Sequence, residues 1–547
     1  LTGACAQVSP LEGGPIDTIP PKLISSYPMH ESTGFQDKNI QLTFDKEIDV
    51  QDIYNRLIVT PRLTKLEGKP SYVYKVQGRT LKLKLASPLE AATTYTFNFK
   101  DAIKDTREGT AAESPTITFS TGAYVDSMYV SGKVKYLMTD KPSSNTLVSL
   151  YKVTEEDTLH ILNSVPDYFT KTNEEGHFKL DHIKQGQYRI YAGHSEENKL
   201  IIDPSKEAYG FLTDPIDLSE PIENLMLAIL QADVTEFKLQ GKQPQNQYFE
   251  INFSKPVVKY TLALVHKPKR FKEDYLYSNL IKNGHIIRIY NTLGLLEEDS
   301  LEARLVAADS MGSIIEETID IHFSEGRAAK EPLTYTFSPP SGAKVRPAFE
   351  GSMLLSKPVR DVLTDSLFFV VNDQDTIQIA PEDLHFKAQR DSIIIRKQLD
   401  LCSVAHKVDE ETTGDTQVGV VLHIAKGAFV AVDKELNKAV RYHYTLQNPQ
   451  SCGTIKGRVT TQAAGFIIQL LNEQYEVVDE IRNEPYYQFQ DVLPGNYRLR
   501  ILVLQDGDAE WRFGNINQLE PPDPVIFYPH ELSIVANWEL DYIDFEF

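Results

Sequence analysis

Apolar and polar residues alternate along most of the chain, in short runs rather than in long helical periods. Clear examples are residues 40–44, 80–85, 94–99 and 116–119, in which every second residue is apolar. A period of two is typical of a strand with one buried face. Glycine, proline, asparagine and aspartate interrupt these runs about every ten residues, a spacing that favours β-sandwiches over alternating strands and helices. The pattern predicts an all-β protein.

Two segments are copies of one module. Residues 178–190 (FKLDHIKQGQYRI) correspond at constant spacing to residues 487–499 (YQFQDVLPGNYRL). A matching strand pattern precedes each copy, Val130–Val134 in one case and Ile455–Val459 in the other. The shared order of apolar residue, gap, glycine and tyrosine predicts a strand, a turn that needs glycine at positive φ, and a second strand led by a buried aromatic side chain.

A second type of repeat runs through the remaining chain. Residues 42–48 (LTFDKEI) resemble residues 251–257 (INFSKPV) and 353–359 (MLLSKPV). The last two copies lie about 100 residues apart, which is the size of a sandwich of about seven strands. The last copy departs most from the pattern, because residues 402–418 form an irregular polar insertion.

The stretch Leu1–Cys5 (LTGAC) has the order of aliphatic residue, small residues and cysteine at which a lipoprotein signal peptide is cleaved. Residues 6–22 are rich in glycine and proline and lack an apolar period, as a tether should. We therefore predict a lipobox remnant and tether, with a lipid on Cys5; the alternative is an ordinary cysteine at this position. The chain has no apolar run of about 18 residues, so membrane attachment would depend on this lipid.

Several blocks of the N-terminal region resemble the bacterial Ig-like domain found at the N-terminus of a large class of Bacteroidota lipoproteins. The blocks are Asp17–Leu23, Leu42–Asp45, Thr94–Phe97 and Phe119–Gly122. The two modules with the G-x-Y-R pattern resemble the transthyretin-like, carboxypeptidase-regulatory-type β-sandwich, which has no peptidase machinery of its own. The resemblance implies a lipid-anchored protein of the outer membrane, with the cell surface favoured over the periplasmic face.

The expected architecture is a tandem array of Ig-like and transthyretin-like β-sandwiches after the tether at 1–22. A bacterial Ig-like domain is expected at 23–123, and a transthyretin-like sandwich at 127–235. Two Ig-like sandwiches follow at 236–328 and 331–450, the second with the insertion, and a transthyretin-like sandwich at 453–547 ends the array.

The charge balance narrows the choice of partners. Lys and Arg number 56 against 77 Asp and Glu, so the formal net charge is −21. Such a chain should repel polyanions, which excludes a general nucleic-acid-binding role. The partners we expect are the membrane, through the lipid anchor, and an integral outer-membrane β-barrel protein or other envelope subunits.

Three cysteines are present. With Cys5 assigned to lipidation, Cys402 and Cys452 are a candidate disulfide pair for an oxidising compartment. The alternative is two unpaired cysteines on different domains. The cysteine spacing is unlike that of a zinc site.

Motifs of catalysis are missing from the sequence. It contains neither G-x-S-x-G, nor H-E-x-x-H, nor a glycine-rich phosphate loop. Asp506, Asp508 and Glu510 stand where the resembling family often has a calcium-like loop, but Arg512 replaces an acid there, so an ordinary acidic turn is the alternative to Ca²⁺. We therefore expect no catalytic residues and no cofactor beyond the lipid.

Together these features predict a noncatalytic, outer-membrane-anchored lipoprotein. It would act as a protein-interaction or scaffold subunit of an envelope complex, such as the machinery for outer-membrane protein assembly or export. The alternative is a cell-surface glycan-binding lipoprotein in nutrient uptake. That role needs an exposed aromatic platform, for which Trp511 and Trp538 are the available tryptophans.

Overall fold

The structure, a computed structural model, describes residues 17–63, 70–113, 115–153, 165–194, 200–245, 247–266, 276–324, 331–371, 375–399, 418–446, 452–505 and 510–547. Strands dominate this part of the chain, and the α-helix α1 has only four residues, Ile53–Arg56. The predicted all-β fold is therefore confirmed. The chain forms two compact units, residues 1–233 with 515–521, and residues 234–514 with 522–547.

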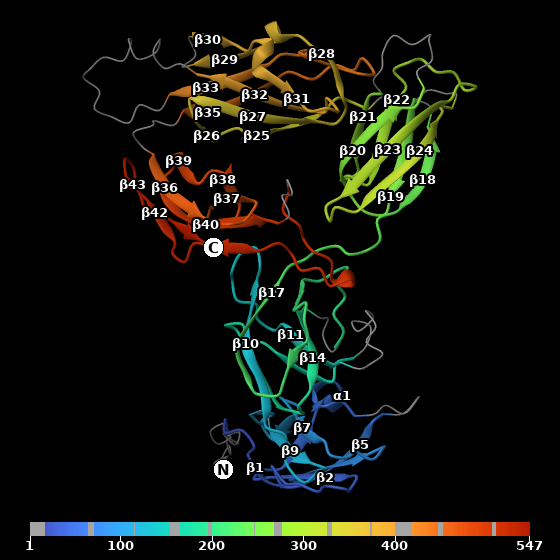
Figure 1. Cartoon of the computed structure of the whole chain (residues 1–547), viewed down its shortest axis with the longest axis vertical. Coiled ribbons are helices and arrows are strands. Elements are labelled where there is room, and N and C mark those ends of the chain that lie inside the picture. Colours follow the sequence, from blue (N-terminus) through green and yellow to red (C-terminus); the bar gives the residue numbers. More distant parts are fainter. Residues whose placement is uncertain are drawn as a thin grey trace, which may run out of the picture. The chain divides into compact units, whose positions relative to one another are not determined.

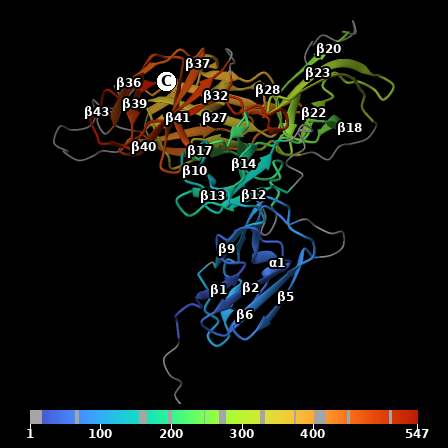
Figure 2. The same cartoon turned by 60° about the horizontal axis from the view of Figure 1, so that its bottom comes forward.

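The first unit begins with sandwich 1, which contains the strands β1 to β9. One sheet has the order β1-β2-β6-β5, another has the order β4-β7-β9, and β3 pairs with β8 (Figure 2). The alternating runs predicted as strands form β2, β6, β7 and β9. The bounds are β1 Leu23–Tyr27, β2 Asn39–Phe44, β3 Ile48–Val50, β4 Ile58–Thr60, β5 Tyr72–Gln77, β6 Thr80–Leu85, β7 Thr94–Asn98, β8 Ile103–Asp105 and β9 Thr116–Ser120.

Sandwich 2, also in the first unit, contains β10 to β17. Its sheets have the orders β13-β10-β17 and β12-β11-β14-β15, with β16 also paired to β14. The strand β17 runs parallel to β10, whereas the other pairs are antiparallel. The bounds are β10 Met128–Tyr136, β11 Leu147–Lys152, β12 Tyr168–Lys171, β13 His177–Ile183, β14 Gln187–Gly193, β15 Tyr209–Phe211, β16 Ile216–Asp217 and β17 Ile222–Ile229.

The second unit contains sandwiches 3 and 4 and all of sandwich 5 except residues 515–521, which belong to the first unit (Figure 1). Sandwich 3 has the sheets β18-β19-β22-β21 and β20-β23-β24. Its first sheet repeats the order of the first sheet in sandwich 1, as the second sequence repeat predicts. The bounds are β18 Leu239–Pro244, β19 Tyr248–Phe253, β20 Val257–Leu264, β21 Ser278–Ile281, β22 Ile286–Tyr290, β23 Leu301–Asp309 and β24 Ile314–Ile321.

Sandwich 4 repeats this arrangement with β25-β27-β32-β31 as its first sheet. The second sheet has the order β26-β35-β33-β29-β30, and β28 pairs with β34. The predicted insertion at 402–418 lies, except for residue 418, outside the described residues. The bounds are β25 Tyr335–Ser338, β26 Lys344–Val345, β27 Ala348–Leu355, β28 Val359–Val362, η2 Thr364–Ser366, β29 Leu367–Val371, β30 Asp375–Gln378, η3 Pro381–Asp383, β31 Leu384–Phe386, β32 Ser392–Gln398, β33 Gly419–Ile424, β34 Phe429–Ala431 and β35 Val440–Leu446.

Sandwich 5 repeats the topology of sandwich 2, as the first sequence repeat predicts. Its sheets have the orders β39-β36-β43 and β38-β37-β40-β41, with β44 paired to β36 and β42 paired to β40. The bounds are β36 Gly453–Thr460, β37 Gly465–Leu471, β38 Val477–Arg482, β39 Tyr486–Val492, β40 Gly495–Leu504, η7 Ile516–Gln518, β41 Val525–Phe527, β42 Leu532–Ile534, β43 Glu539–Leu540 and β44 Phe545–Glu546.

Each sandwich has its own hydrophobic core. Five large clusters of buried apolar residues lie within residues 35–119, 130–229, 237–323, 333–446 and 455–545 of the described chain. The inward positions of the alternating strands supply them; Leu81, Leu83 and Leu85 of β6, for example, are almost fully buried. The domain boundaries given above stay a prediction.

The second repeat contains a lysine that joins separate segments within each of sandwiches 1, 3 and 4. In sandwich 3, Lys255 Nζ lies 2.5 Å from Asp309 Oδ2 at the end of β23, and it donates to Thr235 O at 2.9 Å. The Lys255 side chain is 3% exposed and that of Asp309 is not exposed at all. The carboxylate also accepts hydrogen bonds from the backbone N–H groups of Met311 and Ser313. We call this arrangement the lysine lock.

Sandwiches 1 and 4 have the same lock. In sandwich 4, Lys357 contacts Asp433 and donates to Glu331 O, with its side chain 1% exposed. In sandwich 1, Lys46 contacts Asp17, Asp105 and Ile19 O, with 22% of its side chain exposed. A buried ion pair is stable only when both charges find such partners, so the lysine of the repeat has a structural role.

The residue before the lysine bonds to the backbone just before the first strand in each of sandwiches 1, 3 and 4. Asp45 Oδ1 accepts a hydrogen bond from Lys22 N, Ser254 Oγ from Lys238 N, and Ser356 Oγ from Thr334 N, at 2.8, 2.8 and 3.0 Å. Short polar side chains of this kind readily bond to nearby backbone. These hydrogen bonds, together with the ion pairs of the lysine that follows, explain why a short polar residue and a lysine recur side by side in the repeat.

Candidate functional site

Sandwiches 3 and 4 touch through buried polar and aromatic side chains. Asn279, 1% exposed, donates from Nδ2 to Ser356 O at 3.1 Å and accepts from Tyr290 Oη at 3.1 Å. Tyr248, Tyr290 and Val432 form a small buried cluster beside this contact. Buried hydrogen bonds of this kind are costly to leave unmade, so they hold the two sandwiches in a defined relation.

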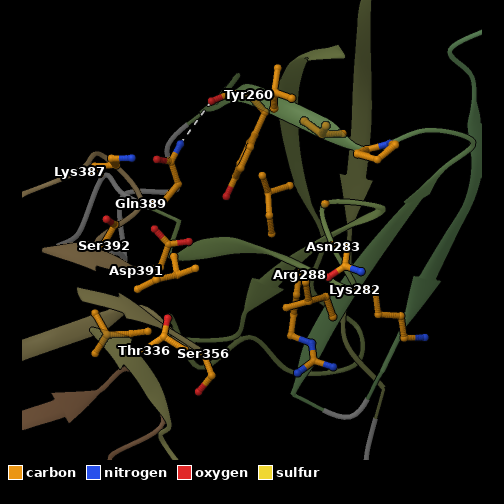
Figure 3. A pocket seen from close by; sticks show the side chains of 18 of the residues that line it. Tyr260, Lys282, Asn283, Arg288, Thr336, Ser356, Lys387, Gln389, Asp391 and Ser392 are labelled. Atoms are coloured by element: carbon orange, nitrogen blue, oxygen red, sulfur yellow. Dashed lines mark hydrogen bonds between the residues drawn. The ribbon is translucent and has the colours of Figure 1, made fainter. Parts of the chain in front are cut away.

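Next to this contact lies a cleft of about 1050 Å³. Sandwich 3 lines it with residues 256–260 around the start of β20 and with the β21–β22 turn. Sandwich 4 lines it with residues 334–336, 354–356 and the turn between β31 and β32. Figure 3 shows Gln389, Asp391 and Ser392 on one side, with Asn283 and Arg288 on the other.

One hydrogen bond crosses the cleft directly. Gln389 Nε2 donates to Tyr260 O at 3.4 Å (Figure 3), and the Tyr260 hydroxyl donates to Ser278 Oγ at 3.0 Å. These two bonds connect the β31–β32 turn to the edge strand β20. The two hydrogen bonds fix the positions of polar groups that line the cleft.

The lining of the cleft is more positive than the chain as a whole. Lys259, Lys282 and Lys387 are exposed at its surface. Arg288 is also cationic, but ion pairs with Glu250 and Glu331 at 2.8 Å compensate its charge. In a chain of net charge −21, a rim of this kind suits a polar or acidic ligand.

Asp391 is a carboxyl group of the cleft whose pKa is shifted. Burial raises the pKa of its carboxyl above the ordinary value, although its own backbone N–H and Lys387 act in the opposite direction. A raised carboxyl pKa means that the folded protein binds this proton more tightly than the unfolded chain does. The resulting stabilisation is present at low pH and is lost as the pH rises through the folded-state pKa.

Replacing Asp391 by asparagine should therefore raise the melting temperature at neutral pH, by on the order of one to two degrees. The difference should shrink toward about pH 3, where the wild-type carboxyl is protonated in both states. Calorimetric scans between about pH 3 and about pH 7 measure this dependence, with the exposed Asp361→Asn as the matched control. A lower melting temperature for Asp391→Asn at pH 7 would contradict the assignment.

Of the three cysteines predicted as sites, Cys452 lies among the described residues. Cys5 and Cys402 lie outside the described residues. Cys452 is 5% exposed, directly before β36, and its backbone oxygen accepts from Asn537 N at 2.8 Å. Lipidation of Cys5 and pairing of Cys402 with Cys452 therefore stay predictions.

The predicted calcium ligands also lie partly outside the described residues. Asp506 and Asp508 lie outside the described residues, and Glu510 is exposed, with Oε2 at 3.8 Å from Arg482 Nη2. Arg512, noted in the sequence as a replacement for an acid, pairs with Asp523, which is 1% exposed. Trp511 Nε1 donates to Asp523 O at 3.0 Å, so this loop is fastened by an ion pair and an indole.

Sequence reasoning did not find the cleft. Its polar residues come from separate turns, and no spacing links Tyr260 to Gln389 and Asp391. A signal was present for the lysine lock, since Lys255 and Lys357 stand at the same place in the repeat. Within the described residues no group of three His, Cys, Asp or Glu side chains is placed to hold a metal ion. No helix among them has the length and apolar character needed to cross a membrane.

Comparison with known proteins supports one domain directly. A search among curated proteins finds no matching sequence. Solved structures that resemble the chain include the major pilin subunit BcpA of Bacillus cereus, at 10% identity over 77% of this chain and 98% of that one, with a TM-score of 0.13. The S-layer protein rSbsC(31-844) matches at 12% identity over 90% of this chain and 64% of that one, with a TM-score of 0.14.

Similarity at such TM-scores carries no inference about function. The family model described as "Bacterial Ig-like domain" matches residues 17–121, which enclose the strands β1 to β9 of sandwich 1. The predicted N-terminal Ig-like domain is thereby confirmed, whereas the resemblance to Bacteroidota lipoproteins and the transthyretin-like assignment of sandwiches 2 and 5 stay predictions. Residues 17–121 form a bacterial Ig-like domain.

Proposed function

We propose that this protein is a noncatalytic scaffold of the bacterial cell envelope, anchored to the outer membrane through a lipid on Cys5. Its tandem β-sandwiches present large surfaces of loops and sheet edges to partner proteins. The bacterial Ig-like domain at residues 17–121 and the lipobox pattern at Leu1–Cys5 support the envelope location.

The observation that carries the noncatalytic role is the use of buried charge. Lys255, Lys357 and Asp523 are almost completely buried, and each faces an opposite charge inside its own sandwich. Catalytic groups must instead be open to a substrate. Asp391, whose pKa is raised, does lie in the cleft between sandwiches 3 and 4, but no histidine or cysteine is among the described residues that line this cleft. In this protein the buried ion pairs hold strands together. The loops and sheet edges at the surface of the sandwiches are therefore the parts that would bind partner proteins.

A second candidate function follows from the cleft between sandwiches 3 and 4. Hydroxyl, amide and ammonium groups line its space of about 1050 Å³. Such groups suit a polar oligosaccharide, especially one with acidic sugars. The cleft gives less support to the exposed aromatic platform expected of glycan binders, because Tyr260 in its lining is 5% exposed.

The test of the scaffold role is isolation of the native protein from membranes in mild detergent. We expect an integral β-barrel protein or other envelope subunits to remain bound in stoichiometric amount, and mass spectrometry identifies them. The Cys5→Ala protein should appear in the soluble fraction, because removal of the lipid removes the anchor.

Two results would contradict the proposal. Retention of the Cys5→Ala protein on membranes washed with high salt, which screens electrostatic contacts, would exclude the lipid anchor. Recovery of the wild-type protein alone, together with retardation on a gel containing acidic polysaccharide, would favour the glycan-binding role. A Lys259→Gln, Lys282→Gln, Lys387→Gln variant then shows whether the cleft is the binding site, since it removes the positive rim and leaves the core untouched.

A further inference from the structure

The outer face of the first sheet in sandwich 1 carries a row of lysines. We name it the lysine trough and define it by the outward residues Tyr27, Asn39, Gln41, Val73, Lys75, Lys82 and Lys84, which line a shallow hollow of about 450 Å³. The inner face of the same strands bears Leu81, Leu83 and Leu85 of the core. Because side chains alternate along a strand, Lys82 and Lys84 must point outward.

The strand register places these lysines directly beside one another. Lys82 of β6 pairs with Lys75 of the edge strand β5, and Lys84 pairs with Val73. Side chains opposite each other on antiparallel strands have Cβ atoms about 5 Å apart, so two like charges there are destabilising. The fold gains nothing from Lys75 facing Lys82.

Among the described residues, these lysines form no ion pair with an acid. Within the described chain, no carboxylate lies within ion-pair distance of Lys75, Lys82 or Lys84. Asp37 touches the lining through its Oδ2, at 3.5 Å from the Tyr27 hydroxyl. Asp37 also accepts a hydrogen bond from Asn39 Nδ2 at 2.9 Å, and Asn39 is the strand partner of Lys84, so Asp37 lies at the Lys84 end of the trough. Lys75 is farther away, because Tyr27 on β1 is three strands from it, which is about 14 Å at the usual strand spacing. The lysines thus form a local positive surface on a chain of net charge −21.

We propose that the lysine trough binds the phosphate groups of an anionic membrane surface. The lysines supply charge complementarity, and Tyr27 and Val73, each 53% exposed, supply the aromatic and apolar contacts that favour the interface between headgroups and acyl chains. This inference rests on the proposed anchor for its orientation. The segment from Cys5 to Leu23 can reach at most about 60 Å, so it would keep sandwich 1 close to the lipid.

The acidic character of the whole chain does not oppose this contact. Charges farther than about 8 Å are screened at physiological ionic strength, so the membrane responds to the charge of the face that touches it. Each lysine near an anionic surface strengthens binding about fivefold, and three together by on the order of a hundredfold. This is a weak contact on its own, but an anchored domain meets the membrane at high effective concentration.

The test uses the full chain with Cys5→Ala, so that the lipid anchor does not contribute. We expect this protein to sediment with phosphatidylcholine vesicles that contain one third phosphatidylglycerol, and not with pure phosphatidylcholine vesicles. The added changes Lys75→Gln, Lys82→Gln and Lys84→Gln should weaken binding on the order of a hundredfold. The matched control changes three exposed lysines of sandwich 4, Lys344→Gln, Lys426→Gln and Lys438→Gln, and should bind as before.

A charge reversal separates binding from folding. Lys82→Glu places a carboxylate opposite Lys75, so the melting temperature should stay equal or rise while vesicle binding is lost. A fall in melting temperature would mean that the lysine row is structural, and this would overturn the proposal. Equal sedimentation of the triple-glutamine variant would overturn it as well.

Other results would point elsewhere. Capture of an acidic envelope protein that depends on the three lysines, without vesicle binding, would assign the trough to a protein partner instead of a membrane. Fractionation of cells expressing the wild-type chain and Cys5→Ala, with the membranes washed at high salt to remove electrostatic contacts, tests the anchor by itself. Failure of the anchor and failure of the trough are therefore seen in different experiments.

Discussion

Replacement of Lys255 by methionine is expected to lower the free energy of unfolding of sandwich 3 by about 3–5 kcal/mol. Methionine fills the space of the aliphatic stem but leaves the carboxylate of Asp309, which has no exposed surface, without its counter-charge. Two backbone N–H groups, from Met311 and Ser313, are the partners that remain. Breaking a buried pair from one side is costly because the other charge stays behind.

Hydrogen exchange measured on peptides from residues 236–328 reports this loss locally, which matters because a chain of several domains does not unfold in one step. Lys238→Met is the matched control, since this lysine pairs with Glu236 at the surface with 59% of its side chain exposed, and its loss should cost about 1 kcal/mol at most.

The double variant Lys255→Met, Asp309→Asn should recover most of the stability. Asparagine removes the charge and keeps an oxygen for Met311 and Ser313. A cost below about 1 kcal/mol for Lys255→Met alone would show that the lock does not stabilise the sandwich. Among the three locks, Lys46 should matter least, because 22% of its side chain is exposed.

Much of the fold could be read from the sequence because its information is local. The runs around β2, β6, β7 and β9 follow the period of two, and both repeat types correspond to repeated sheet orders. The repeat also marked Lys255 and Lys357 as equivalent, but it did not reveal that each is buried. Their partners Asp309 and Asp433 come from later in the chain and share no obvious context with the lysine.

The candidate sites depend on long-range placement and were harder to predict. In the cleft, Tyr260 and Gln389 meet only because sandwiches 3 and 4 dock through Asn279. In the lysine trough, Lys75 and Lys82 are close in sequence, but their repulsion becomes visible only once the register of β5 and β6 is known. A one-residue shift would turn the lysines toward the core.

A second large effect is expected in sandwich 5. Replacement of Gly457 by alanine should lower its free energy of unfolding by about 2–4 kcal/mol. A Cβ atom at this position would lie 1.9 Å from Ile543 O and 2.7 Å from the Tyr487 hydroxyl. The Tyr487 hydroxyl donates to Ile543 O at 2.5 Å, and Ile543 N donates to Lys456 O. The alanine Cβ atom would displace Ile543 and thereby break or lengthen both hydrogen bonds.

Tryptophan fluorescence can follow this change selectively, because both tryptophans of the chain, Trp511 and Trp538, lie in the last module. Gly419→Ala in sandwich 4, followed by hydrogen exchange on peptides of that sandwich, is the matched control, since nothing lies within 4 Å of its added Cβ atom, and it should alter stability by less than about 1 kcal/mol. The same crowding recurs in sandwich 2, where a Cβ on Gly132 would lie 1.9 Å from Leu225 O. If Gly457→Ala and Gly132→Ala both lower the free energy of unfolding by this amount, the close approach of a parallel strand is a requirement of the fold that the two modules share. If either alanine is tolerated, the backbone at that position can move aside, and the sequence repeat alone relates the two modules.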